Sequence, residues 1–242
     1  MFLLTLSTSC GKSMPSIGGG DPTKEFGECM KLSEKGKFED TVQCLEMFKA
    51  RYPQTKLGQE AELRIGDAYF AKKEYLLAAE AYLAYLRLHP RSRKADYAHF
   101  RIGEAYFRES PKAIDRDQEY LESAIDHLAI VIRRYPNSPY AGLAKTAWQK
   151  ARKRVARRTF YIGRFYYRTG EYKSCIPRFL EVASRYPDSG LADKSLFKAL
   201  EAALELKKIE KAKEAYGMLL SDYPDSKYTK SAEKKLLRRI KN

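Results

Sequence analysis

Apolar and small residues recur every three or four positions in five stretches of this chain, and each stretch ends at a proline. The closing triplets are Arg51-Tyr52-Pro53, Leu88-His89-Pro90, Arg134-Tyr135-Pro136, Arg185-Tyr186-Pro187 and Asp222-Tyr223-Pro224. This period predicts amphipathic helices, and proline ends each one because it lacks an amide hydrogen and clashes with the preceding turn. Self-similarity at this spacing predicts stacked helical repeats, which usually provide binding surfaces rather than catalysis.

Two of the repeats share one internal spacing. The second and fourth have small, aromatic, small, aromatic and proline positions at offsets 0, 3, 12, 16 and 24: Gly66, Tyr69, Ala78, Tyr82 and Pro90, then Gly163, Tyr166, Cys175, Phe179 and Pro187. This matches the tetratricopeptide (TPR) pattern. We expect the small residues to let the two helices of a repeat approach closely and the aromatic residues to fill the seams.

Two irregularities lengthen the third and fourth repeats. The third, from Gly103 to Pro136, has nine extra residues, which we place in a loop around Ser110–Gln118. Pro136 to Gly163 spans 27 residues where the earlier repeats have 13, and the 14 added residues make about four helical turns. The sequence therefore predicts one long helix over Pro139–Tyr167. The terminal repeats are less regular, as expected of units that cap a stack; they keep Thr41, Leu45 and Pro53, and Ala212, Tyr216 and Pro224.

The predicted fold is an all-α, TPR-like helical solenoid of five helix-turn-helix repeats, with the long helix joining repeats three and four. No run of alternating β-branched residues suggests a sheet. We divide the 242 residues into a signal remnant (1–9), an anchored cysteine with a flexible tether (10–23), repeats one to three (24–136), and the long helix with repeats four and five (137–242).

The net charge of +15 indicates acidic partners of some kind. Part of it lies in the long helix, whose candidate basic residues are Lys150, Arg154, Arg157 and Arg158. Either these cations line a solvated helix face, or they meet an acidic partner or anionic lipid head groups. No RNA-recognition or zinc-finger signature accompanies them, so nucleic acid is not an expected partner.

The amino terminus favours an envelope location. An apolar stretch runs into small residues and then Cys10, which resembles a bacterial lipoprotein signal whose cysteine is acylated. The usual positively charged start is missing, and Ser7 stands where leucine is common. The simpler interpretation is a disordered tail with a stray cysteine. The glycine-rich and proline-containing segment Gly11–Thr23 reads as a tether between an anchor and a folded body. The sequence has no stretch of about 20 apolar residues, so it does not predict a membrane-spanning helix.

The sequence contains no recognisable catalytic or metal motif. His89, His99 and His127 do not form an i, i+4 metal pair, and no cofactor is expected. The chain is therefore not expected to be an enzyme.

Cys29 and Cys44 belong to the two helices of the first repeat. A disulfide between them suits an oxidising periplasm, but spacing does not establish its geometry, and we favour buried free thiols for both and for Cys175.

Together these features resemble the BamD/ComL family of outer-membrane assembly lipoproteins of Gram-negative bacteria. The resemblance rests on Asp115-Arg116-Asp117-Gln118, Arg134-Tyr135-Pro136-Asn137-Ser138-Pro139-Tyr140, the segment from Tyr166 to Tyr172, and Arg185-Tyr186-Pro187-Asp188-Ser189. It implies a lipid anchor at the periplasmic face of the outer membrane. The implied partners are a BamA-type insertase, other assembly lipoproteins and unfolded β-barrel precursors. A periplasmic TPR adaptor for cell-wall synthesis or envelope constriction, and a cytosolic TPR scaffold, are the alternatives.

The resemblance also implies site residues. Arg178 matches a family arginine that contacts the insertase, although an exposed helix charge is the simpler interpretation. For the precursor groove we assign Tyr69, Tyr75, Arg101 and Tyr106. Tyr69 and Tyr106 occupy the aromatic position of the repeat and so favour the core; Lys72, Lys73 and Arg108 are the exposed alternatives.

Overall fold

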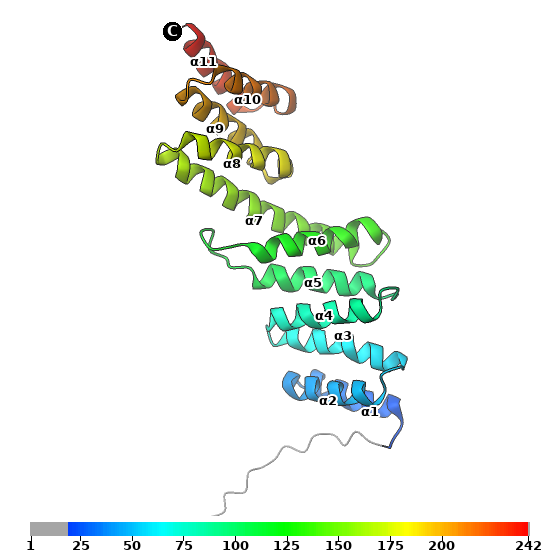
Figure 1. The fold of residues 1–242 in the computed structure, drawn as a ribbon. Coiled ribbons are helices and arrows are strands. Elements are labelled where there is room, and N and C mark those ends of the chain that lie inside the picture. Colours follow the sequence, from blue (N-terminus) through cyan, green and yellow to red (C-terminus); the bar gives the residue numbers. More distant parts are fainter. Residues whose placement is uncertain (1–18, 242) are drawn as a thin grey trace, which may run out of the picture. The chain divides into compact units, whose positions relative to one another are not determined.

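The computed structural model describes residues 19–241, and within this range the chain is helical without a β-strand (Figure 1). The helices are α1 (Pro22–Glu34), α2 (Phe38–Arg51), α3 (Lys56–Ala71), α4 (Tyr75–Leu88), α5 (Ala95–Glu109), α6 (Glu119–Arg134), α7 (Ala141–Arg168), α8 (Tyr172–Arg185), α9 (Ala192–Glu205), α10 (Ile209–Asp222) and α11 (Lys227–Lys241), with a 3-10 turn η1 (Pro187–Ser189). The predicted all-α, TPR-like solenoid is confirmed. None of these helices has both the length and the apolar character needed to cross a membrane.

The described chain forms two compact units, which meet in sequence between Ala98 and His99. In the first unit α1 packs on α2, α2 on α3, and α3 on α4. In the second unit each helix from α6 to α10 packs on the next, and α11 packs on both α9 and α10. Each unit is therefore built by the same rule of neighbour-to-neighbour packing that defines helical repeats.

One turn type joins the paired helices in four of the five repeats. Two positions after the first helix of each pair, a residue adopts φ between 58° and 80°: Gly36, Lys73, Gly170 and Lys207. The following amide then donates back across the helix end, as from Glu74 to the Tyr69 carbonyl at 3.0 Å and from Glu171 to the Tyr166 carbonyl at 2.9 Å. This Schellman cap satisfies the final carbonyls and reverses the chain, so the second helix returns along the first.

A glycine on the first helix makes room for a large side chain on the second. A Cβ on Gly66 would lie 2.6 Å from the Tyr82 ring, and one on Gly163 would lie 2.8 Å from the Phe179 ring. These are the positions at offsets 0 and 16 of the repeat, so the predicted close approach is confirmed. Each second helix ends two residues before its proline, at Arg51, Leu88, Arg134, Arg185 and Asp222, as the triplets predict.

Both predicted irregularities are confirmed. Residues 110–118 form the loop between α5 and α6, and α7 is a single helix from Ala141 to Arg168. The structure adds α11, a helix that the sequence pattern did not single out. Its buried Ala232 and Leu236 cover the last repeat.

The expectation of free thiols at Cys29 and Cys44 was wrong. The two cysteines form a disulfide, with their Cα atoms 5.4 Å apart on α1 and α2. The short turn at Gly36 folds α2 back onto α1 and brings them opposite each other. Cys175 is free and buried, as expected, and burial raises the pKa of its thiol to about 11.

The glycine contact can be tested by adding a methyl group. Gly163→Ala is expected to lower the free energy of unfolding by about 1–3 kcal/mol, because the new Cβ overlaps the Phe179 ring. Gly217→Ala is the matched control, since no atom lies within 4 Å of that added Cβ on α10. There helix propensity predicts no loss and a gain of up to about 1 kcal/mol. Equal unfolding curves for the two variants in urea would show that the contact does not limit the packing.

The disulfide closes a separation of 15 residues, a loop size for which about 3 kcal/mol of stabilisation is expected. Dithiothreitol should therefore lower the urea midpoint of the wild-type chain. It should have no effect on a Cys29→Ser, Cys44→Ser variant, which is destabilised from the outset. A thiol count on the unfolded, unreduced chain that finds Cys29 and Cys44 reactive would contradict the pairing.

Candidate functional site

The inserted loop is held against the long helix by arginine side chains of α7, of which Arg154 makes the most contacts. The guanidinium of Arg154 donates to the carbonyls of Ser110 (3.2 Å) and Pro111 and to the Gln118 side-chain oxygen (3.1 Å). It also lies 5.2 Å from the centre of the Phe107 ring. Burial lowers the pKa of Arg154. Because no carboxylate takes part in these contacts, the cation acts here as a multiple hydrogen-bond donor that fixes the loop.

Gln118 completes this network from the loop side. Its side chain is only 6% exposed, and its amide nitrogen donates to the carbonyls of Pro111 (2.9 Å) and Ala113 (3.1 Å). The last residue of the Asp115-Arg116-Asp117-Gln118 motif thus links carbonyls within the loop and stabilises its conformation. Neighbouring Arg158 donates to the Arg116 carbonyl at 3.1 Å and lies 3.7 Å from the Asp117 carboxylate.

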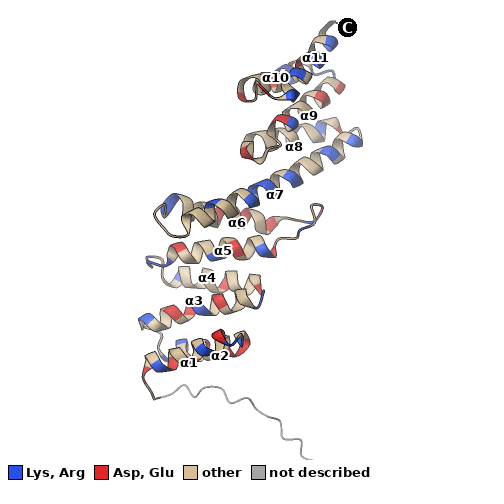
Figure 2. Cartoon of the chain, turned by 180° about the vertical axis from the view of Figure 1, so that it is seen from behind, with Lys and Arg blue, Asp and Glu red and all other residues tan. Residues whose placement is uncertain are grey.

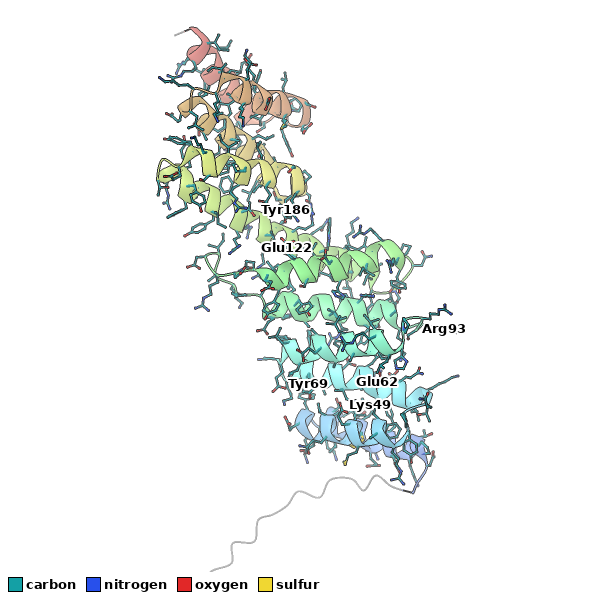
Figure 3. All side chains as sticks on the ribbon, in the orientation of Figure 1. Lys49, Glu62, Tyr69, Arg93, Glu122 and Tyr186 are labelled. Atoms are coloured by element: carbon teal, nitrogen blue, oxygen red, sulfur yellow. A yellow bond between two sulfur atoms is a disulfide. The ribbon has the colours of Figure 1, made fainter. Side chains whose placement is uncertain are left out.

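Beside this loop, a polar cleft of about 200 Å³ brings Arg158 and Arg178 together. Its remaining lining residues are Asp117, Gln118, Glu119, Glu122, Val155, Thr159, Ile162 and Glu181. Glu122 of α6 accepts a hydrogen bond at 3.3 Å from the hydroxyl of Tyr186, the residue that directly follows α8 (Figure 3). Burial and the nearby Glu122 raise the pKa of Tyr186 to about 12.

Arg178 lies on α8 with half of its side chain exposed (51%). Its recorded partner is Glu181, one turn along the same helix, at 3.3 Å. An exposed pair at this spacing is worth about 0.3–0.5 kcal/mol, so little is lost when a carboxylate from another protein replaces Glu181. The geometry leaves Arg178 available for such a contact, and the contact itself stays a prediction.

A second groove in this unit, about 490 Å³ in volume, lies between α5, α7 and the inserted loop. Its lining residues are Phe100, Glu104, Phe107, Arg108, Ser110, Lys112, Leu143, Thr146, Ala147, Lys150 and Arg154. The groove combines an apolar floor with a basic rim. Of the four predicted basic residues, Arg154 and Arg158 are thus engaged by the chain itself, whereas Lys150 and Arg157 are exposed. Figure 2 shows how closely Lys and Arg follow one another along α7.

The first unit has its own groove, of about 610 Å³, between α2, α3 and α4. Tyr69 of α3 lines it, together with Lys49 and Glu62 (Figure 3). The floor and one wall are apolar, and Leu77 (44% exposed) and Leu88 (66% exposed) are accessible at α4. Tyr69 is therefore half-buried at the edge of a groove, which fits both its repeat position and its predicted binding role.

The other predicted groove residues do not line either groove. Tyr75 packs edge-on against Phe70, at 5.1 Å between ring centres. In the second unit Arg101 pairs with Glu104 at 3.0 Å, and Tyr106 stacks on Tyr120 at 5.8 Å. The repeat pattern alone could not show that Leu143 and Lys150 line a groove while Arg101 and Tyr106 do not. That groove is formed by the inserted loop and the long helix α7, and neither belongs to the regular repeat.

No cluster of three or more metal-binding side chains occurs among residues 19–241. His99 and His127 meet through their Nδ1 atoms at 3.0 Å. Burial, with smaller effects of His127 and Arg134, lowers the pKa of His99 to about 4. At neutral pH the pair is thus uncharged, and one ring donates to the other.

Helix pairs that pack neighbour on neighbour, with close glycine contacts inside several pairs, define this protein as a TPR-type helical-repeat protein. Its family follows from sequence comparison: the YfiO family of outer membrane lipoproteins matches residues 21–218, and the chain belongs to this family. The predicted resemblance is thereby confirmed. Cys10 lies outside both the matched range and the described residues.

Two curated relatives carry the name outer membrane protein assembly factor BamD. The protein from Vibrio cholerae is 26% identical over 215 residues, which cover 85% of this chain and 89% of the relative. The protein from Caulobacter vibrioides is 26% identical over 195 residues, which cover 81% of this chain and 64% of the relative. Among solved structures, the TPR2AB domain of yeast Sti1 aligns with a TM-score of 0.43 and 14% identity, over 91% of this chain and 84% of that one.

The loop network predicts a local effect of Arg154→Met. This change removes the donors to the loop carbonyls, and hydrogen bonds to a charged group contribute about 1.5–3 kcal/mol. Backbone amides of residues 110–118 should therefore exchange with deuterium at least about tenfold faster. Arg157→Met, on the same helix with an exposed side chain, should leave exchange in the loop unchanged. Identical loop exchange in both variants would contradict the assignment.

Proposed function

We propose that this chain is a binding scaffold of outer-membrane protein assembly, held at the periplasmic face of the outer membrane. The observation that carries the proposal is the family match over residues 21–218, together with relatives that are named assembly factors. The scaffold role is non-enzymatic: it positions other proteins through grooves and exposed charges. The helical repeats supply such surfaces at low structural cost, because each helix pair is stabilised by its neighbours.

The anchor in this proposal is a lipid on Cys10. The lipoprotein-like sequence before Cys10 and the tether after it support this step. An acylated cysteine followed by a flexible segment would keep the folded body close to the membrane without a spanning helix. Mass spectrometry of the amino terminus, from chain purified out of envelopes, tests the step directly. An unmodified, full-length amino terminus would remove it.

The insertase contact in this proposal is Arg178 with its cleft. The cleft is polar, partly open and lined by both charge signs, so a partner carboxylate can replace Glu181 without exposing an unpaired charge. Precursor segments would bind at the grooves, where an extended peptide packs aromatic side chains on an apolar floor. Tyr69 is supported for this role by its place in the first unit's groove. Tyr75, Arg101 and Tyr106 would act next to these surfaces.

Reversing the charge of Arg178 tests the contact. Arg178→Glu should weaken binding to the purified barrel insertase by at least about tenfold, because attraction at a close charge pair becomes repulsion. Lys173→Glu is the matched control: it lies on the same helix, is exposed, and has the same charge change. If both variants bind the insertase like the wild type, Arg178 is not the contact. Depletion of the chain should also lower porin levels, and normal porins after depletion would remove the proposed function itself.

A further inference from the structure

Helix α7 has an extreme charge pattern. Its 28 residues contain no Asp or Glu, and nine of them are Lys or Arg. Arg152 pairs with Asp188 at 2.7 Å, and Arg154 and Arg158 hold the inserted loop. Lys153 interacts electrostatically with Asp188. Among the described residues, none forms an ion pair with the other five basic residues of α7: Lys145, Lys150, Arg157, Arg164 and Arg168.

Four of these five cations line up on one face. At about 100° per residue, Lys150, Arg157, Arg164 and Arg168 fall within a narrow arc of the helix. Two exposed aromatic residues share it, Tyr161 (39% exposed) and Phe165 (50% exposed). Arginine interleaved with accessible aromatic rings is the composition of protein-binding hot spots. We call these six residues the α7 stripe.

The stripe leads into the groove between α5 and α7. Lys150 belongs to both, and Leu143, on the same face of α7, is 58% exposed at the groove's edge. Arg108 and Lys112 add two further exposed cations to the rim. The single carboxylate in the lining, Glu104, is already paired with Arg101 at 3.0 Å. The groove is therefore suited to an apolar side chain flanked by acidic ones.

We propose that the α7 stripe and this groove form a docking surface for an acidic, extended polypeptide segment that places an apolar side chain in the groove. Unpaired cations along one line match a segment with carboxylates at regular intervals. From Lys150 to Arg168 the stripe is about 27 Å long, which is the length of about eight extended residues. The presence of the groove favours a polypeptide partner over a lipid surface. A side chain of a polypeptide can enter the groove, whereas a flat bilayer would pass over it.

This surface is separate from the Arg178 cleft. Val155, Thr159 and Ile162, which line the cleft, lie on the side of α7 opposite the stripe. Both surfaces can thus be occupied at once. The inference deepens the proposed function and rests on its assignment of peptide binding to the grooves, but it is independent of the Arg178 contact: the stripe can bind its segment even if Arg178 contacts no insertase.

The test uses fluorescence anisotropy with the full chain and a labelled synthetic peptide of about twelve residues. The peptide alternates Asp and Glu with Ser and carries one Phe; a second peptide has Ser in place of Phe, and a third has Lys in place of the acids. The Phe-containing acidic peptide should bind most tightly and weaken with added salt. The basic peptide should not bind.

Matched variants identify the surface. Lys150→Glu, Arg157→Glu, Arg164→Glu together should weaken binding by at least about tenfold, equivalent to about 1.4 kcal/mol. Lys211→Glu, Lys230→Glu, Lys234→Glu has the same net charge, is exposed on α10 and α11, and should bind like the wild type. Leu143→Gln should weaken the Phe peptide while leaving the Ser peptide unchanged, which a purely electrostatic attraction would not do.

Three outcomes overturn the proposal. The first is an affinity that falls equally in both triple variants, since net charge alone would then explain it. The second is no detectable binding of the acidic peptides to the wild type. The third is binding to phosphatidylcholine vesicles containing phosphatidylglycerol that depends on the stripe, without stripe-dependent binding of the peptides, since the surface would then serve lipid. Circular dichroism of each variant confirms that it is folded.

Discussion

The packing of the central helix pairs depends on a glycine, which has no side chain, at one position of the first helix. Where Gly66 faces Tyr82, and Gly163 faces Phe179, the ring occupies the space that a Cβ would need. The ring then sets the distance between the two helices, and the left-handed turn sets their direction. Tyr82 extends this contact, since its hydroxyl donates to Asp67, the residue after the glycine. Once distance and direction are fixed within a pair, the grooves between pairs follow, because they are the spaces that paired helices leave at their edges.

The third repeat keeps the glycine contact, between Gly103 and Leu128, but differs in the connection between its two helices. Its two helices lack the short left-handed turn, and residues 110–118 take its place. A loop of this length has its own unsatisfied backbone carbonyls, which need partners unless they are solvated. Helix α7 supplies donors to several of them, because Arg154 donates to the Ser110 and Pro111 carbonyls and Arg158 to the Arg116 carbonyl. We therefore regard the inserted loop and α7 as a single structural feature, in which the helix supplies the hydrogen-bond donors that the loop carbonyls need.

The sequence predicted what depends on local spacing. Helix ends, the glycine contacts, the inserted loop and α7 all follow from residues that repeat at fixed offsets. It did not predict the Cys29–Cys44 disulfide, because pairing depends on the rotation of α2 about α1 and not on their separation in sequence. It also could not divide the basic residues of α7 by role. Arg154 and Arg157 are the same residue type in the same helix. The position of the inserted loop makes Arg154 a donor to carbonyls and leaves Arg157 exposed.

That division changes how the charge of +15 is understood. Arg152 is neutralised by Asp188, whereas Arg154 keeps its charge and directs its donors at carbonyls of the inserted loop, so both contribute to packing within the chain. Along the α7 stripe, Arg164 and Arg168 are one helical turn apart and the other neighbouring cations are two turns apart, so their mutual repulsion is unfavourable in the free protein. Residues elsewhere avoid this cost by pairing with carboxylates one turn away, as Arg178 does with Glu181. An acidic segment laid along the stripe would replace this repulsion with attraction, so the absence of Asp and Glu from α7 favours a partner that brings its own carboxylates.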